Sequence, residues 1–196
     1  GMYSLTLLLG LAIMIFGVYP LLVYLFTGKK YGFFFSGIGP AQLVAFTTSS
    51  SAATLPVTME RVEEHLGVKK EAASFILPIG ATVNMDGTSC YQAVAAIFIA
   101  QAFDIDLSIG AQLGIILTAT LASIGAAAVP SAGIIMLVIV LGQAGIPEAG
   151  IALIFAVDRP LDMCRTVVNV TGDATVSMMV AKSLDKLHDP KPKEWD

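Results

Sequence analysis

The sequence is poor in charged residues and rich in apolar ones. Only 13% of its 196 residues are charged, whereas 56% are hydrophobic; a soluble globular domain carries about 25% charged residues. The few charges are clustered, because none occurs before Lys29, between Lys30 and Glu60, or between Asp106 and Glu148. Long uncharged stretches of this kind argue against a water-soluble enzyme and indicate an integral membrane protein.

Cysteine, histidine and basic clusters are also scarce. Cys90 and Cys164 lie in apolar segments, so we expect neither a disulfide framework nor a zinc site. His65 and His188 lie in charged segments without the spacing of a catalytic triad or a metal site, so the sequence predicts no enzyme activity and no catalytic residue. The net charge of −4 argues against a nucleic-acid partner.

The first apolar segment reads as a simple transmembrane helix within residues 1–28. Residues 5–26 are long enough, at about 1.5 Å per residue, to cross a hydrocarbon core of roughly 30 Å. Residues 31–66 instead hold two shorter apolar runs that meet at a polar tip, residues 47–51. Neither run can cross alone, so we expect a re-entrant hairpin, whose tip needs protein or water to satisfy its backbone.

The same pattern recurs in the next part of the chain. Residues 71–103 are long enough to span but are interrupted at residues 84–87, and residues 107–146 form a second pair of apolar runs joined at residues 123–131. Interrupted segments at matching positions in two halves point to the substrate site of a transporter.

The last long segment, residues 150–183, is an apolar helix with one polar face, and residues 184–196 read as a solvated cytoplasmic tail. The predicted fold class is therefore an all-α integral membrane protein with transmembrane helices and two re-entrant helical hairpins.

The distribution of basic residues predicts the topology. If both hairpins are re-entrant, the loops of one side hold only Asp104, Asp106 and Glu148 as charges. The positive-inside rule then places the C-terminus in the cytoplasm of a multi-pass protein of the cell (inner) membrane. The alternative, in which every apolar segment spans, needs spans of only about 12 to 15 residues, which are too short. The basic residues of the other side are Lys29, Lys30, Arg61, Lys69, Lys70, Lys182, Lys186, Lys191 and Lys193.

A polar stripe runs along the last helix. At about 100° per residue its members fall within roughly 80° of one another. An ionisable group at the bilayer centre costs about 2.5 to 3.5 kcal/mol, so such groups face a protein interior and mark ion or substrate paths. The stripe consists of Asp158, Asp162, Arg165, Asn169 and Asp173.

The alternative for this stripe is a purely structural network. Asp162 would pair with Arg165, and Asp158 with Arg159 or Arg165. That network leaves the last two stripe residues without cationic partners, which favours the functional interpretation.

Three further segments carry polar chemistry, each with a simpler alternative. Asn84 to Thr88 offers carbonyls, an amide and a carboxylate suited to an alkali cation, or is a glycine kink with Asp86 bonded to a neighbouring helix. The serine tip, Ser49 to Ser51, offers an anion site at a helix start or a simple cap. The second tip offers small, mobile residues or close helix packing.

Four motifs in order resemble the glutamate transporter family of dicarboxylate/amino acid:cation symporters. They are SSSAATLP at residues 49–56, NMDGT at residues 84–88, ASIG at residues 122–125, and DMCRT followed by NVTGD at residues 162–173. The resemblance covers nearly the whole chain but only the C-terminal half of the family, so the N-terminal scaffold half would be missing here. It implies sodium-coupled symport of glutamate or aspartate by alternating access, in a homotrimer within the lipid bilayer.

The resemblance also implies a substrate-binding set. Arg165 would hold the side-chain carboxylate and Asp162 the amino group, while the two hairpin tips close over the substrate. The implied set is Ser50, Ser51, Met85, Thr88, Ala128, Asp162, Arg165, Thr166 and Asn169.

Sodium is the implied coupling ion, with no other cofactor. One implied site combines Asp173 with oxygens of Gly80, Asn84 and Asn169. A second uses carbonyls of Thr82, Ser123, Ile124 and Ala126. A third uses Asn84 and Asp86 with groups from a helix outside this chain.

The chain departs from the family pattern at several positions. The family usually carries an extra arginine where this chain has Ser49 or Met163, and Arg159 is a candidate substitute. Ala128 and Ser131 replace glycines common in the second tip.

Two other interpretations remain. A proton-coupled or C4-dicarboxylate symporter is disfavoured by Asp162, because succinate has no amino group to pair with it. The other is an anion channel or a non-transporting membrane subunit.

Overall fold

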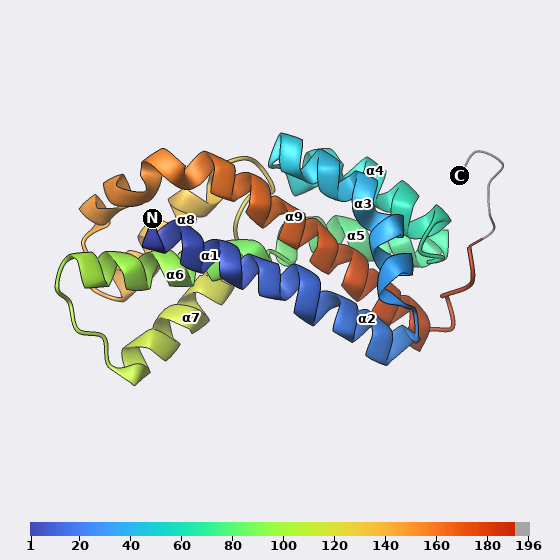
Figure 1. Ribbon diagram of the computed structural model, residues 1–196, viewed down its shortest axis with the longest axis horizontal. Coiled ribbons are helices and arrows are strands. Elements are labelled where there is room, and N and C mark those ends of the chain that lie inside the picture. Colours follow the sequence, from blue (N-terminus) through green and yellow to red (C-terminus); the bar gives the residue numbers. More distant parts are fainter. Residues whose placement is uncertain (191–196) are drawn as a thin grey trace.

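Helices make up almost all of the regular structure in residues 1–190, the part of the chain that the computed structural model describes. The one strand-like feature in this part is an isolated antiparallel bridge between Val68 and Leu187. Figure 1 shows the helices running mostly along one long axis. The elements are α1 (Met2–Ile13), η1 (Met14–Val18), α2 (Tyr19–Thr27), α3 (Tyr31–Thr48), α4 (Ser51–Glu64), α5 (Lys70–Val83), α6 (Asp86–Ala102), α7 (Ile109–Ile124), α8 (Ala132–Gln143), η2 (Glu148–Ile151) and α9 (Ala152–Ser183).

The first three elements form one helical run, Met2–Thr27, which is long and apolar enough to cross a membrane. Its middle is a turn of π-helix, Met14–Val18, directly before Pro20. Because proline has no N–H to donate to the preceding turn, a wider turn at this point is expected. The run ends at Gly28, whose φ of 73° is a left-handed conformation suited to glycine.

Two helical hairpins approach each other in the middle of the molecule. Helices α3 and α4 are joined at Ser49 and Ser50, and α7 and α8 are joined by residues 125–131. Figure 1 shows the tips of both pairs near the centre, with their open ends pointing to opposite ends of the long axis. The four helices of the two hairpins, α3, α4, α7 and α8, have 12 to 18 residues. They are therefore shorter than the about 20 apolar residues that cross a membrane.

The helix between the hairpins is broken. Helix α5 ends at Val83 and α6 begins at Asp86, so Asn84 and Met85 are non-helical. The α6 start lies directly against α9, because a Cβ on Gly87 would come within 2.6 Å of the Arg165 carbonyl oxygen. Glycine is therefore required at this position for the break to approach α9.

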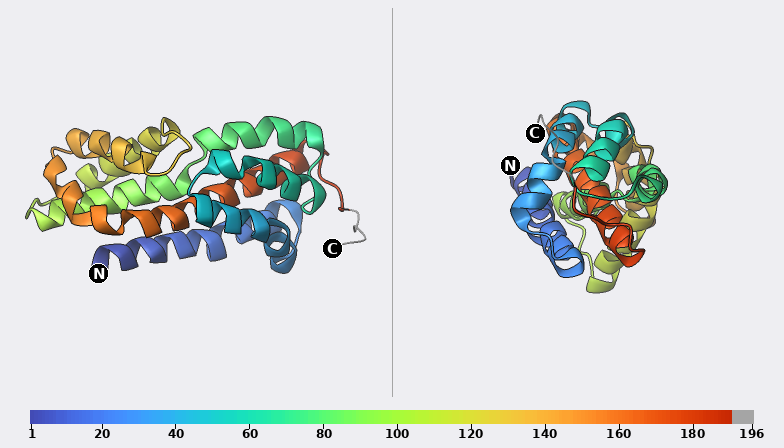
Figure 2. Two further views of the ribbon diagram at one scale, coloured as in Figure 1. Left: turned by 90° about the horizontal axis from the view of Figure 1, so that it is seen from above. Right: turned by 90° about the vertical axis from the view of Figure 1, so that its right-hand side faces the viewer.

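Helix α9 lies at the centre and packs against α1 to α6. Figure 2 shows the hairpins and the N-terminal helix grouped around it. One apolar cluster joins α9 to α1, α6, α7 and α8, and a second joins it to α2, α3, α4 and α5. Between the two clusters, the polar middle of α9 meets both hairpin tips. A site for a polar ligand is expected at this meeting point.

The segment after α9 returns to the α4–α5 loop. The Lys69 amide donates to the Lys186 carbonyl and the His188 amide donates to the Gly67 carbonyl, each at 2.9 Å. The Lys29 ammonium also contacts the Asp189 carboxylate. The backbone of residues 186–188 therefore pairs with the α4–α5 loop, while the Asp189 side chain is 89% exposed.

This pairing depends on glycine and on charge. Gly67 has a φ of +81°, and a Cβ there would collide with the His188 carbonyl oxygen. The hydrogen bond from Lys29, together with its positive charge, lowers the pKa of Asp189 below the ordinary aspartate value. Lys191, Lys193 and Trp195 lie outside the described residues.

Candidate functional site

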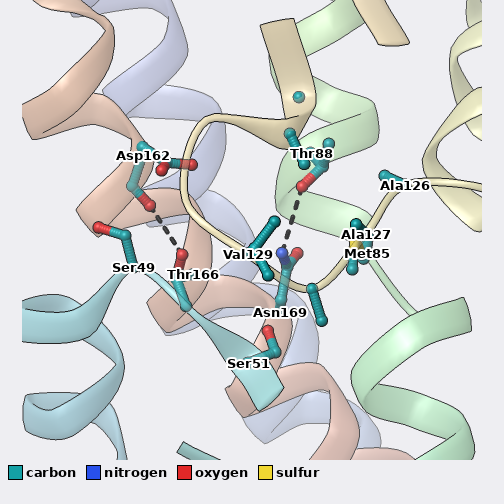
Figure 3. A pocket seen from close by; sticks show the side chains of 13 residues that line it. Ser49, Ser51, Met85, Thr88, Ala126, Ala127, Val129, Asp162, Thr166 and Asn169 are labelled. Carbon is teal, nitrogen blue, oxygen red and sulfur yellow. Dashed lines mark hydrogen bonds between the residues drawn. The ribbon is translucent and has the colours of Figure 1, made fainter. Parts of the chain in front are cut away.

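A small pocket lies where the hairpin tips, the helix break and α9 meet (Figure 3). Its volume is about 20 Å³, close to the space of a single water molecule. A ligand the size of an amino acid therefore requires the lining segments to move apart. The pocket is lined by Ser49, Ser51, Met85, Thr88, Ala126, Ala127, Ala128, Val129, Ala132, Gly133, Asp162, Thr166 and Asn169.

The structure brings most of the implied substrate residues to this pocket. Ser50 and Arg165 do not line it. The remaining members of that set do, and they are Ser51, Met85, Thr88, Ala128, Asp162, Thr166 and Asn169.

Ser50 joins the two hairpin tips. Its hydroxyl donates to the Ala128 carbonyl at 2.6 Å and accepts from the Ala53 amide at 3.1 Å. The second contact is the cap that the sequence alternative foresees for the serine tip. The first contact closes the pocket, because it holds one tip against the other.

Asp162 faces both the pocket and the second tip. Its Oδ2 accepts a 3.0 Å hydrogen bond from the Ser131 amide, and its Oδ1 accepts a 2.9 Å bond from Arg165 Nη2. Ser131 has a φ of 62°, a left-handed conformation that is unfavourable for a residue with a side chain. Asp162 therefore holds the second tip in a strained conformation.

Arg165 lies immediately behind the pocket wall. Its side chain is 1% exposed and its Nη2 also donates to Asp158 Oδ1 at 2.9 Å. The guanidinium carbon lies 3.7 Å from the centre of the Tyr91 ring. A Cβ added to Gly133, which lines the pocket, would lie 3.5 Å from Arg165 Nη1. Only a glycine therefore separates this cation from the cavity.

The structural alternative expects ion pairs of Arg165 with Asp158 and Asp162, and both are formed, through Nη2. They leave the other two guanidinium nitrogens of Arg165, Nε and Nη1, buried without a hydrogen-bond partner in residues 1–190. Buried unpaired donors on a charged group are costly, so they are available to an acceptor that enters beside them.

Asn169 ties the helix break to α9. Its Oδ1 accepts from the Gly87 amide at 2.8 Å, and its Nδ2 donates to the Thr88 hydroxyl at 3.3 Å, the latter drawn in Figure 3. One turn before it, the Thr166 hydroxyl donates to the Asp162 carbonyl at 2.9 Å. These contacts fix the floor of the pocket.

Three members of the first implied cation site lie together. Asp173 is buried, and its Oδ1 accepts from the Asn84 amide at 3.0 Å. A Cβ on Gly80 would lie 2.7 Å from the same oxygen. Within residues 1–190 no ion pair of Asp173 with a basic side chain is found.

The other implied cation residues are more scattered. Ser123 and Ile124 line a second cavity together with Asp86, and Ala126 lines the main pocket. Thr82 is exposed and donates its hydroxyl to the Ile79 carbonyl at 3.0 Å. Asp86 Oδ2 accepts from the Tyr19 hydroxyl at 2.9 Å, which is the contact with a neighbouring helix that the kink alternative expects.

The described residues contain no cluster of three or more histidine, cysteine, aspartate or glutamate side chains that could hold a metal ion. A sodium site built from carbonyl and amide oxygens with one carboxylate needs no such cluster, because hard cations prefer oxygen ligands.

Sequence reasoning missed several contributors. Tyr91 lies one turn after Thr88 on α6, so its helical spacing could have placed it on the pocket side. Nothing in the sequence signals that Tyr19 of the first helix reaches Asp86. The wall residues Ala127, Val129 and Gly133 could be expected only as members of the small-residue tip.

A polar pocket between two hairpin tips and a broken helix resembles the substrate sites of secondary transporters. Residues 1–183 match the sodium:dicarboxylate symporter family, and the chain belongs to that family. The predicted resemblance is thereby confirmed, and the family and the relatives are transporters and not enzymes.

The chain is also similar to curated transporters. It is 51% identical to the rabbit (Oryctolagus cuniculus) excitatory amino acid transporter 3 over 182 residues, and 50% identical to the human protein of that name over the same length, 93% of this chain in each case. It is 50% identical to an excitatory amino acid transporter of Caenorhabditis elegans over 174 residues, 89% of this chain. In all three comparisons the chain spans 35% of the relative's length. These relatives and the family are membrane transport proteins.

Proposed function

We propose that this chain is the substrate-binding part of a sodium-coupled symporter of acidic amino acids, glutamate or aspartate, that works by alternating access. The observation that carries the proposal is the juxtaposition, at one pocket, of a cation with two unused donors and a carboxylate: Arg165 behind Gly133, and Asp162 in the lining. An acidic amino acid presents the complementary charges, a second carboxylate and an ammonium group. Similarity to the excitatory amino acid transporters supports the same substrate class.

Arg165 is suited to the ligand's side-chain carboxylate. A guanidinium is always charged and its planar fork matches a carboxylate in two parallel hydrogen bonds. Nη2 is held by Asp158 and Asp162, so Nε and Nη1 remain for the ligand. Thr166 and Asn169, on the same face of α9, are placed for the main-chain part of the ligand.

The first of three sodium sites would lie beside Asp173. A buried carboxylate with a neutral amide partner keeps an uncompensated charge, which a cation relieves. Gly80, Asn84 and Asn169 would add oxygens, while Thr82, Ser123, Ile124 and Ala126 would form a second site. Asn84 and Asp86 would contribute to a third. Because binding free energies are linked, sodium and substrate would raise each other's affinity by the same factor.

The two hairpin tips would open and close the pocket. The Ser50–Ala128 and Ser131–Asp162 contacts seal a cavity too small for a ligand, so binding requires at least one tip to withdraw. The short paired helices would enter the membrane as re-entrant hairpins, with their tips protected by α9 and the broken helix.

We further propose that the protein lies in the cell (inner) membrane with its C-terminus in the cytoplasm. The basic residues of the described loops lie at one end of the molecule, where α2, α4 and α9 end. The chain spans 35% of the relatives' length, which supports an additional scaffold half in the complete protein. Assembly as a homotrimer is part of the same proposal and rests on the family resemblance.

The test is uptake of radiolabelled aspartate by the complete transporter in proteoliposomes. An inward sodium gradient should drive accumulation, and replacement of sodium by choline at equal ionic strength should abolish it. Accumulation driven by a proton gradient alone would instead indicate the proton-coupled alternative. Anion current without substrate accumulation would indicate a channel.

A further inference from the structure

Asp162 lies beside two cationic side chains of the protein itself, Arg159 and Arg165. Its Oδ1 accepts from Arg165 Nη2 at 2.9 Å, and its Oδ2 lies 3.7 Å from Arg159 Nη1. The same Oδ2 accepts from the Ser131 amide at 3.0 Å. The carboxylate is therefore compensated on both oxygens by the protein itself.

We propose that Arg159 is a specificity-determining residue, whose guanidinium competes with the amino group of a ligand for Asp162 Oδ2. This inference rests on the proposed function, in which Asp162 holds that amino group. It predicts that Arg159 weakens the site's preference for amino acids over acidic ligands that have no amino group, of which succinate is the simplest four-carbon example.

The position of Arg159 suits competition and not direct binding. It lies three residues before Asp162, on the rim side, and it does not line the pocket. Its side chain is 54% exposed, so it is partly hydrated already and can leave Asp162 for solvent. An arriving ammonium group must either displace this guanidinium or lie close to it, and both cost free energy.

A ligand without an amino group does not compete with Arg159 for Asp162. Arg159 stays on Oδ2, so Asp162 keeps its partner, and the added positive charge attracts the ligand's carboxylates. Removal of Arg159 therefore favours the ammonium-bearing ligand relative to the other one. The attraction to carboxylates is common to aspartate and succinate, so the ammonium group alone changes the ratio of the two affinities.

The expected size of the effect is modest, because solvent screens a pair in which one partner is half exposed. Coupling energies of exposed ion pairs correspond to roughly a threefold change in an equilibrium constant. We therefore expect Arg159→Ala to raise the ratio of the succinate Kd to the aspartate Kd by about threefold or more.

The experiment measures aspartate and succinate binding to the complete transporter at one fixed sodium concentration. Arg159→Ala and Arg159→Gln remove the charge and should both raise the ratio. Arg159→Lys keeps the charge and should stay near the wild-type ratio. Lys182→Ala, which removes an exposed cation from the far end of the same helix, is the matched control and should leave the ratio unchanged.

An unchanged ratio in both neutral variants overturns the proposal, as does a wild type that binds aspartate but no succinate. Loss of both ligands in both neutral variants also overturns it, because Arg159 would then be needed for binding as such. A wild type that binds neither ligand in sodium contradicts the proposed function itself, so the two failures are distinguishable.

Discussion

Asn84 donates a 3.0 Å hydrogen bond to Asp173 and so joins the break between α5 and α6 to the middle of α9. This is a neutral partner for a buried acid, in contrast to Asp162 and Asp158, which share Arg165. The two ends of the polar stripe therefore have different electrostatics. One end is compensated by a fixed cation, and the buried acid at the other end has a neutral amide partner.

Gly80→Ala should lower sodium affinity. The new methyl group would come within 2.7 Å of Asp173 Oδ1, so the carboxylate or the helix must shift by several tenths of an ångström. A sodium titration of aspartate binding should show a midpoint raised by about tenfold, since a small displacement of a ligand oxygen costs about 1.4 kcal/mol or more. Gly114→Ala is the matched control, because its Cβ would meet no atom within 4 Å. If Gly80→Ala and Gly114→Ala have equal sodium midpoints, the assignment of Gly80 to the sodium site is wrong.

Arg165→Cys should abolish binding of acidic substrates while neutral amino acids remain tolerated. The substitution removes the cation that lies beside Gly133 and leaves Asp162 to hold an amino group. Competition binding with aspartate and serine measures both effects. Arg165→Lys, which keeps the charge but loses the fork, should retain weak aspartate binding. Wild-type aspartate affinity in the cysteine variant would contradict the assignment.

The proposed orientation is open to labelling from the two sides of the membrane. In a background with Cys90 and Cys164 replaced by alanine, single cysteines at Asp104 and at Lys186 should react with an impermeant reagent from opposite faces. The reason is that the α6–α7 loop and the segment after α9, which hold these positions, lie at opposite ends of the helical bundle (Figure 1). Labelling of both positions from one face would exclude the re-entrant arrangement of the hairpins.

The contact between Lys29 and Asp189 should make the tail sensitive to acid. The contact lowers the pKa of Asp189, so its stabilising effect is complete above the ordinary aspartate pKa and is lost as the pH falls through the lowered value. Hydrogen exchange of the His188 amide, corrected for the intrinsic rate, should show protection that decreases in this acidic range.

Asp189→Asn should reduce that protection at neutral pH and abolish its dependence on acid. Asp185→Asn, a nearby exposed acid, is the control and should behave like the wild type. Protection that is independent of pH in the wild type would show that the backbone pairing alone holds the tail.

Much of this architecture follows from sequence because polar groups are costly in an apolar chain. A helix of 32 residues carries Asp158, Arg165 and Asp173, and such groups must face the protein interior, so one face of α9 could be assigned without coordinates. The break at Asn84 could be expected in the same way, because glycine and asparagine interrupt an otherwise apolar segment.

Other features depend on contacts between distant segments and could not be predicted. The bond from Tyr19 to Asp86 requires that the first helix lie beside the broken one. The pairing of residues 186–188 with the α4–α5 loop depends on a close backbone approach at Gly67, which no local pattern encodes.

The central claim is that a sodium ion neutralises Asp173 and thereby couples to substrate binding. Asp173→Asn keeps the volume and the hydrogen bonding of the side chain but removes its charge. The most direct test is a sodium titration of radiolabelled aspartate binding by the complete transporter, wild type against this variant. We predict a strongly raised sodium midpoint and a lower aspartate affinity at fixed sodium, which added sodium partly restores because the coupling is reciprocal. A sodium midpoint equal to that of the wild type would contradict the account and make Asp173 a structural residue.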